Sequence, residues 1–391
     1  MKHFPFLLIA TLAFLAAAGC AGEEASVRAT VTVAEAMAAD TAGYARATAV
    51  RPFVFPEDHG PHPDFKSEWW YVTGNLAAAD GRRFGYELTI FRFALAPPDG
   101  TARASAWATR QLYMGHFAVT DVAGRRFFPF ERFSRGAAGL AGARARPFRV
   151  WLEDWYLEAD TTQPAPDPAL PVMRLRAHED GTGVDLVLRP LKPIVLQGDR
   201  GLDPKGDDPG NASYYYSMTR IATEGTVTVD GATFPVEGLS WMDREWSTSA
   251  LGPDQVGWDW FALQLSDGRE LMFYRLRERD GGISPTSDGV LVAGDGTPRR
   301  LDHTDVVVDV LDRWTSPHSG AVYPARWRLR VPREALDLTL TPLLADQEMN
   351  VSVRYWEGAV RVEGTAAGSP VEGHGYVELT GYDEAGVTPG G

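Results

Sequence analysis

The chain has 391 residues, of which 44% are hydrophobic and 23% are charged, a composition typical of a folded globular protein. It carries 52 acidic and 38 basic residues, and the net charge of −14 argues against a nucleic-acid partner, because phosphate binding needs a basic face. The 40 glycines and 27 prolines favour short strands and turns over helices, and the 12 tryptophans favour a cavity with flat apolar walls.

The N-terminus has the pattern of a secretory signal. A short basic start is followed by about fifteen almost entirely apolar residues, too few for a membrane span of about 20 residues. This stretch ends in small residues directly before Cys20, the only cysteine in the sequence. Residues 1–19 are therefore predicted to be a lipoprotein signal peptide that is removed, leaving Cys20 to carry lipid; an ordinary cleaved signal remains the alternative.

The next segment, residues 20–50, is rich in alanine, threonine and glutamate and is predicted to be a flexible tether. Ala21 stands where an aspartate often retains lipoproteins at the inner membrane. We therefore expect the protein in a bacterial cell envelope, facing the periplasm from the outer membrane more than the inner one, or secreted. The predicted lipid anchor at the N-terminus is expected to attach the protein to the membrane.

From residue 51 onward the pattern is that of β-strands. Residues 83–93 are rich in β-forming residues and partly alternate between polar and apolar. Asp230-Gly231 between two such runs predicts a hairpin with a type I′ turn, and residues 266–268 predict another hairpin. Turns recur every 8–15 residues, which indicates an all-β barrel or sandwich.

The chain also looks duplicated. Three segments of its first half recur in the same order in its second half: residues 70–93 as 258–277, residues 186–191 as 338–343, and residues 235–243 as 370–378. The sequence therefore predicts two similar β domains, at 51–247 and 256–385, joined by a short linker.

Familiar catalytic and metal-binding motifs are absent from the sequence. It has no G-x-S-x-G, H-E-x-x-H or Walker motif, and its eight histidines do not pair at metal-ligand spacing. We therefore predict no metal and no cofactor.

Three tryptophan-rich segments are the candidates for a functional site. In the first, Glu68 precedes Trp69 and Trp70, which places an acid next to a large apolar area, unless Glu68 is simply exposed at a strand end. The third segment, residues 256–261, contains Trp258 and Trp260 and lies close to the domain junction, where ligand sites often form.

The second segment contains two acids on one predicted strand face. In a strand, Trp241, Asp243 and Glu245 point to one side, and Met242, Arg244 and Trp246 point to the other. If the first side lines a cavity, desolvation raises the pKa of a carboxyl group, and a neutral acid can donate a proton. The alternative is that Arg244 pairs with a neighbouring acid at a strand end.

Several of these motifs together resemble one known family. They read HPDFKSEWWYVTGNL, DGRRFGYELTIFR, YMGHFAVTD, SYYYSMTR and GLSWMDREW, and the match covers roughly residues 51–385. The chain resembles the AttH-like superfamily, which includes carotenoid 1,2-hydratase (hydroxyneurosporene synthase) and a secreted branch labelled as predicted hydrolases. The resemblance implies two tandem lipocalin-like antiparallel β-barrel domains and a small hydrophobic ligand, such as a terpenoid or another lipid.

The resemblance to the hydratase branch also implies a chemistry. There an aspartate protonates a carbon–carbon double bond and water captures the cation; the matching residue here is Asp243, with Trp241 as the nearby aromatic residue. This sequence departs from that branch because Met242 and Arg244, not histidines, flank Asp243. Arg244 could keep Asp243 ionised by folding back, which would abolish acid catalysis.

Three functions remain open from the sequence: a hydratase-like enzyme acting on a lipophilic ligand by acid catalysis, a lipid carrier without chemistry, and a hydrolase with paired carboxylates. The catalytic candidates are Asp243, Glu245 and Glu68. The predicted ligand-binding residues are Trp69, Trp70, Tyr86, His116, Tyr215, Trp241, Trp258 and Trp260.

Overall fold

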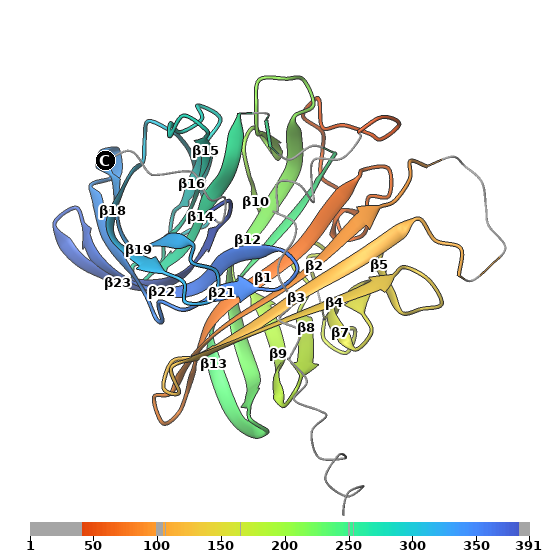
Figure 1. The fold of residues 1–391 in the computed structure, drawn as a ribbon, viewed down its shortest axis with the longest axis horizontal. Coiled ribbons are helices and arrows are strands. Elements are labelled where there is room, and N and C mark those ends of the chain that lie inside the picture. Colours follow the sequence, from red (N-terminus) through yellow and green to blue (C-terminus); the bar gives the residue numbers. More distant parts are fainter. Residues whose placement is uncertain are drawn as a thin grey trace, which may run out of the picture.

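The computed structural model describes residues 41–98, 105, 107–164, 166–248, 251–252 and 254–382. Within these residues the strands form two curled antiparallel sheets, one of 13 strands and one of 10 (Figure 1). The all-β prediction is confirmed. In this part of the chain no helix is long and apolar enough to cross a membrane.

The first sheet runs in the order β4-β3-β2-β1-β13-β12-β9-β8-β7-β6-β5, with β10 and β11 paired to β12. A short 3₁₀ helix, η1 (Glu57–His59), precedes it. Its strands are β1 (Ser67–Ala78), β2 (Arg83–Ala94), β3 (Gln111–Asp121), β4 (Arg126–Arg135), β5 (Ala141–Ala145), β6 (Phe148–Leu152), β7 (Trp155–Ala159), β8 (Met173–Glu179), β9 (Thr182–Pro190), β10 (Val195–Leu196), β11 (Leu202–Pro204), β12 (Ala212–Val229) and β13 (Ala232–Ser247).

The second sheet runs in the order β17-β16-β15-β14-β23-β22-β20-β19-β18, with β21 paired to β22. A second 3₁₀ helix, η2 (Pro332–Glu334), connects two of its strands. Its strands are β14 (Gln255–Leu265), β15 (Glu270–Glu278), β16 (Asp288–Val292), β17 (Pro298–Asp302), β18 (Val307–Thr315), β19 (Val322–Val331), β20 (Leu336–Pro342), β21 (Glu348–Asn350), β22 (Arg354–Ala366) and β23 (Ser369–Leu379).

The two sheet orders place the repeated segments in equivalent positions. The repeats fall on β1–β2 and β14–β15, on β9 and β20, and on β13 and β23. In each sheet the first strand of this hairpin pairs with the strand that comes last in the sequence of that sheet. Thus β1 pairs with β13, and β14 pairs with β23. The first sheet ends at Ser247 and the second begins at Gln255.

Local sequence explains the hairpins that build the sheets. Asp230 and Gly231 both have positive φ, 51° and 76°, as a type I′ turn requires, and they connect β12 to β13. The predicted turn at 266–268 connects β14 to β15.

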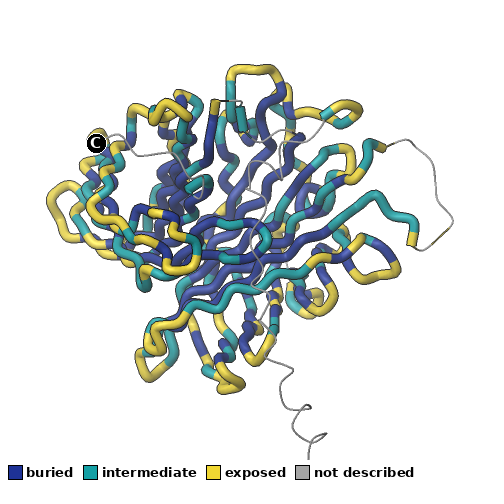
Figure 2. The backbone as a smooth tube through the Cα atoms, viewed as in Figure 1, coloured by how far each residue is buried: buried dark blue, intermediate teal, exposed yellow. Residues whose placement is uncertain are grey.

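Each sheet encloses its own hydrophobic core, and a third cluster lies where the sheets meet. The cluster joins Tyr71, Tyr215 and Trp241 of the first sheet to Trp260, Tyr274 and Tyr376 of the second. Figure 2 shows buried residues along the strands and exposed residues mainly at the turns. This contact between the sheets positions the site described below.

Residues 41–50, which the sequence assigned to a tether, lie against the first sheet. The Ala45 amide donates to the Asp64 carbonyl over 2.9 Å, and the Tyr214 hydroxyl donates to the Ala49 carbonyl over 2.8 Å. Ala47 is buried. For these ten residues the tether prediction is therefore wrong; residues 1–40, with the signal peptide and Cys20, lie outside the described residues.

Candidate active site

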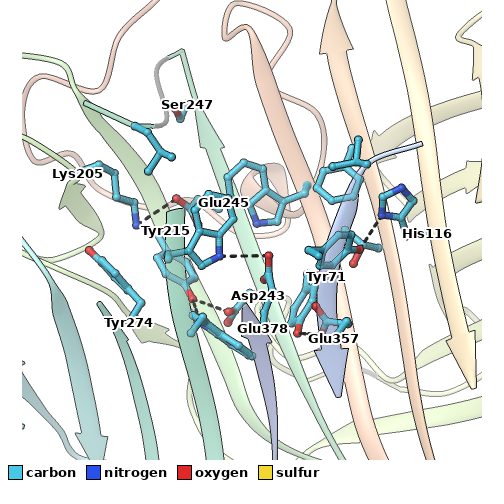
Figure 3. Close-up of a pocket in the computed structure, with 18 of the residues that line it drawn as sticks. Tyr71, His116, Lys205, Tyr215, Asp243, Glu245, Ser247, Tyr274, Glu357 and Glu378 are labelled. Atoms are coloured by element: carbon cyan, nitrogen blue, oxygen red, sulfur yellow. Dashed lines mark hydrogen bonds and ion pairs between the residues drawn. The ribbon is translucent and has the colours of Figure 1, made fainter. Parts of the chain in front are cut away.

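A pocket lies between the two sheets, and aromatic residues are the largest group among those that line it (Figure 3). It holds about 1050 Å³ of space that protein atoms do not fill, part of it open to solvent. The aromatic side chains that line it are Trp69, Tyr71, Phe91, Phe93, Tyr215, Trp258, Trp260, Tyr274 and Tyr355.

Strand β13 carries two acids into this pocket. Because side chains alternate along a strand, Asp243 and Glu245 face the pocket, and Trp241 on the same side packs against Trp260. The register places Tyr71 of β1 and Ser217 of β12 on either side of Asp243.

Three donors hold the Asp243 carboxyl group. The Ser217 hydroxyl and the Trp241 indole N–H donate to Oδ1 over 2.5 and 2.7 Å, and the Tyr215 hydroxyl donates to Oδ2 over 2.5 Å. The Trp260 indole N–H donates in turn to the Tyr215 hydroxyl oxygen over 3.2 Å. The position of the carboxyl group is thus fixed by residues of both sheets.

Opposing effects set the pKa of Asp243. Burial raises its pKa to about 7, while the hydrogen bonds from Ser217, Tyr215 and Trp241 act in the opposite direction and favour the ionised form. A carboxyl group with this pKa exchanges a proton near neutral pH, as a general acid or base requires.

Two more buried carboxyl groups enter the pocket from the second sheet. The Tyr71 hydroxyl donates to Glu357 Oε1 over 2.6 Å, and the Trp258 indole N–H donates to Glu378 Oε1 over 3.2 Å. Burial, with the neighbouring Glu87 carboxyl group, raises the pKa of Glu378 to about 8, and burial with Glu378 raises that of Glu357 well above its usual value.

Glu245 lies next to the basic side chain that lines this pocket. Lys205 Nζ is 3.5 Å from Glu245 Oε1 and 2.5 Å from Asp203 Oδ2, and it lies 4.0 Å from the centre of the Tyr274 ring. Burial raises the pKa of Glu245 despite the nearby ammonium group. The positive charge of Lys205 is thus paired with carboxyl groups of the protein itself.

The opposite face of β13 carries a buried ion cluster. Arg244 and Arg92 both pair with the Glu68 carboxylate, and none of the three is more than 1% exposed. Burial by itself would raise the pKa of Glu68, but the two guanidinium groups outweigh burial and hold it well below its usual value. Arg244 therefore pairs with Glu68 and does not fold back onto Asp243.

Comparison with known proteins assigns the family. The sequence profile of the AttH-like family matches residues 46–382. The chain belongs to this family. A Nitrosomonas europaea protein assigned as an AttH has a crystal structure that is 32% identical and covers 86% of this AttH-like chain and 99% of its own, with a TM-score of 0.74.

Two further relatives are kievitone hydratases. The crystal structure of the enzyme from Nectria haematococca superposes with a TM-score of 0.63 at 15% identity, over 86% of the AttH-like chain and 96% of its own, and so shows the same fold. The kievitone hydratase of Fusarium solani subsp. phaseoli is 22% identical over 214 residues, which are 53% of the AttH-like chain and 59% of the relative.

The structure brings most of the predicted site residues of this AttH-like protein together. Asp243 and Glu245 meet five of the predicted ligand-binding residues at the pocket: Trp69, His116, Tyr215, Trp258 and Trp260. Trp241 contributes through its hydrogen bond to Asp243. His116 lies 2.7 Å from the Tyr355 hydroxyl and 3.0 Å from Glu131 Oε1.

Three predicted site residues lie elsewhere. Glu68 is in the ion cluster behind β13. Trp70 and Tyr86 are in the core of the first sheet, where Trp70 donates to the His59 carbonyl and the Tyr86 hydroxyl lies 2.6 Å from the Ser240 hydroxyl. Trp70 follows Trp69 by one residue, so strand alternation turns it away from the pocket.

Sequence reasoning missed Glu357, Glu378, Lys205 and Tyr71. One signal could have found Glu378: in the repeat that aligns residues 235–243 with 370–378, it is the counterpart of Asp243. Tyr71 also had a signal, because it follows Trp69 by two residues and so lies on the same face of the strand. Glu357 has no such signal, because only strand pairing places it at the pocket. Within the described residues no group of three or more potential ligands could hold a metal ion.

Proposed function

We propose that this AttH-like protein is a hydro-lyase that adds water across a carbon–carbon double bond of a lipophilic ligand, or removes it in reverse. The observation that carries the proposal is Asp243: a carboxyl group in an aromatic pocket, held by three donors, with a pKa of about 7. Its relation to two kievitone hydratases supports this reaction class.

In the proposed reaction the protonated Asp243 gives its proton to one alkene carbon. A C–H bond forms, the π bond breaks, and the neighbouring carbon becomes a cation. Water then forms a C–O bond to that carbon and its released proton returns to the Asp243 carboxylate, so the enzyme is regenerated. The aromatic side chains of Trp258, Trp260 and Tyr71 line the same space and stabilise the cation.

The ligand class follows from the walls of the pocket. Aromatic residues are the largest group in them, which suits a terpenoid or a prenyl chain. A carotenoid is one member of that class, and a carrier without catalysis or a hydrolase using Asp243 with Glu245 are the alternatives that the test must separate.

The test is water addition in H₂¹⁸O, followed by mass spectrometry on a panel of prenylated phenols and terpenes. Wild-type protein should form products heavier by one labelled water, and Asp243→Asn should lose at least about 100-fold in rate. Asp337→Asn, at a partly exposed acid of β20 that pairs with Arg328 and does not line the pocket, is the matched control. Undiminished turnover by Asp243→Asn would eliminate the proposal. Binding without turnover favours a carrier, and cleavage into two products favours a hydrolase.

We also propose that the protein is anchored in the cell envelope through lipid on Cys20, on the basis of the N-terminal sequence. Wild-type protein expressed in a bacterium should partition into detergent, and Cys20→Ala should partition into water. Equal partitioning of the two would contradict a lipid anchor.

A further inference from the structure

The charge balance of the pocket is one-sided. Four carboxyl side chains line it: Asp243, Glu245, Glu357 and Glu378. Among the described residues that line it, Lys205 alone is a lysine or arginine, and its ammonium group is already bound to Asp203. The described lining residues therefore offer no uncommitted lysine or arginine to an anionic ligand, whose charge would be buried among acids without a cationic partner.

One of these acids has an unused hydrogen-bonding atom. Glu357 is fully buried, and its Oε2 has no hydrogen-bond partner among the described residues. Its other oxygen, Oε1, accepts the hydrogen bond from Tyr71. A buried polar atom without a partner is costly, which indicates that a ligand completes this site.

The neighbours of Glu357 determine whether its Oε2 atom carries a proton. The carboxyl groups of Glu378 and Glu87 lie close to it and, together with burial, raise its pKa well above the usual value. The neutral form of Glu357, which carries one O–H group, is thus favoured. Because Oε1 accepts from Tyr71, the proton is placed on Oε2 of this pocket-lining side chain.

We propose that the pocket selects uncharged, oxygen-bearing lipophiles, such as alcohols, phenols or ketones, and that Glu357 binds their oxygen by donating a hydrogen bond from Oε2. Lipids that end in a carboxylate, such as fatty acids, are rejected. The inference uses the ligand pocket of the proposed function and names its substrate class, but it does not depend on turnover.

The experiment compares two probes with the same chain, 1-decanol and decanoate, by tryptophan fluorescence at pH 7.5. Trp69, Trp258 and Trp260 line the pocket and report binding directly. Wild-type protein should bind 1-decanol with a Kd at least tenfold below that for decanoate. Equal or tighter binding of decanoate would overturn the proposal.

Variants of Glu357 test its role as the donor. Glu357→Gln keeps an N–H donor and should keep the preference, whereas Glu357→Leu should weaken 1-decanol binding about tenfold. Glu363→Leu, at an exposed acid of the same strand, is the matched control and should bind as wild type does. Unchanged 1-decanol binding by a folded Glu357→Leu would overturn the proposal. If that variant does not fold, the two-probe comparison and Glu357→Gln still decide.

The outcomes separate this inference from the proposed enzyme activity. A protein that prefers 1-decanol but hydrates no alkene loses the proposed function and keeps the ligand class. A protein that hydrates alkenes but binds decanoate equally well keeps the function and loses the inference.

Discussion

Glu68 and Asp243 are two buried carboxyl groups on opposite sides of β13. The pKa of Glu68 is lowered, whereas the pKa of Asp243 is raised. Glu68 is 0% exposed and Asp243 is 4% exposed, so burial does not distinguish them. Glu68 pairs with Arg92 and Arg244, which keep it ionised, whereas Asp243 has only neutral donors and a pKa of about 7. Whether an arginine reaches the buried acid therefore decides its charge.

The comparison explains how one strand serves both stability and chemistry. Arg244 alternates to the back of β13, where it satisfies Glu68, and this leaves Asp243 without a cation. The same alternation that protects the back face from an unpaired charge keeps the pocket acid able to exchange its proton.

The largest expected effect comes from breaking the ion cluster. Glu68→Gln leaves Arg92 and Arg244 buried without their anion and should reduce the free energy of unfolding by about 3–5 kcal/mol. Asp243→Asn removes only accepting capacity for neutral donors and should cost about 1–2 kcal/mol. Urea denaturation of both variants at pH 7 measures the contrast, and similar losses would contradict it.

The next effect is on the pH dependence of stability. Burial raises the pKa of Glu378 from 4.5 to about 8, so folding takes up a proton between these values. The associated stability is fully present below pH 4.5 and is lost as the pH rises through 8. Between pH 6 and 7.5, Glu378 should therefore make the free energy of unfolding of the wild type decline by about 1.4 kcal/mol per pH unit, and Glu378→Gln should remove this decline.

The control for this effect is the difference between variant and wild type. His59 and His374, whose pKa values are lowered to about 4 mainly by burial, contribute the opposite slope below pH 6.5 in both proteins, and the difference cancels them. Asp337→Asn should leave the slope unchanged. If Glu378→Gln shows the wild-type slope, Glu378 is ionised in the folded protein.

The smallest effect concerns one donor to Asp243. Trp241→Phe removes the indole N–H that lies 2.7 Å from Oδ1 and favours the ionised form, so the pKa of Asp243 should rise by about one unit. Carbon-13 NMR titration of aspartate-labelled protein, with Asp243→Asn to assign the signal, measures the shift. A downward shift would mean that Trp241 stabilises the neutral acid.

Local sequence was sufficient for the elements that depend on neighbouring residues. The hairpin at Asp230-Gly231 and the two faces of β13 were predicted because turn geometry and strand alternation are set within a few residues. The repeats predicted equivalent halves, and the equivalent sheet orders agree with them. The family was indicated by its motifs and is confirmed.

The partners of the buried acids could not be predicted in this way. Glu68 meets Arg92 and Arg244 from 24 and 176 residues away, and Tyr71 meets Glu357 across 286 residues. Strand pairing and the contact between the sheets create these neighbours, and nothing near each residue in the chain encodes them.

By itself the sequence thus determined the all-β fold and the side of β13 on which Asp243 lies, because these follow from local periodicity. Only the tertiary structure decided which carboxyl groups are ionised. Charge depends on desolvation and on the nearest cation, and both are set by strands that are distant in sequence and adjacent in space.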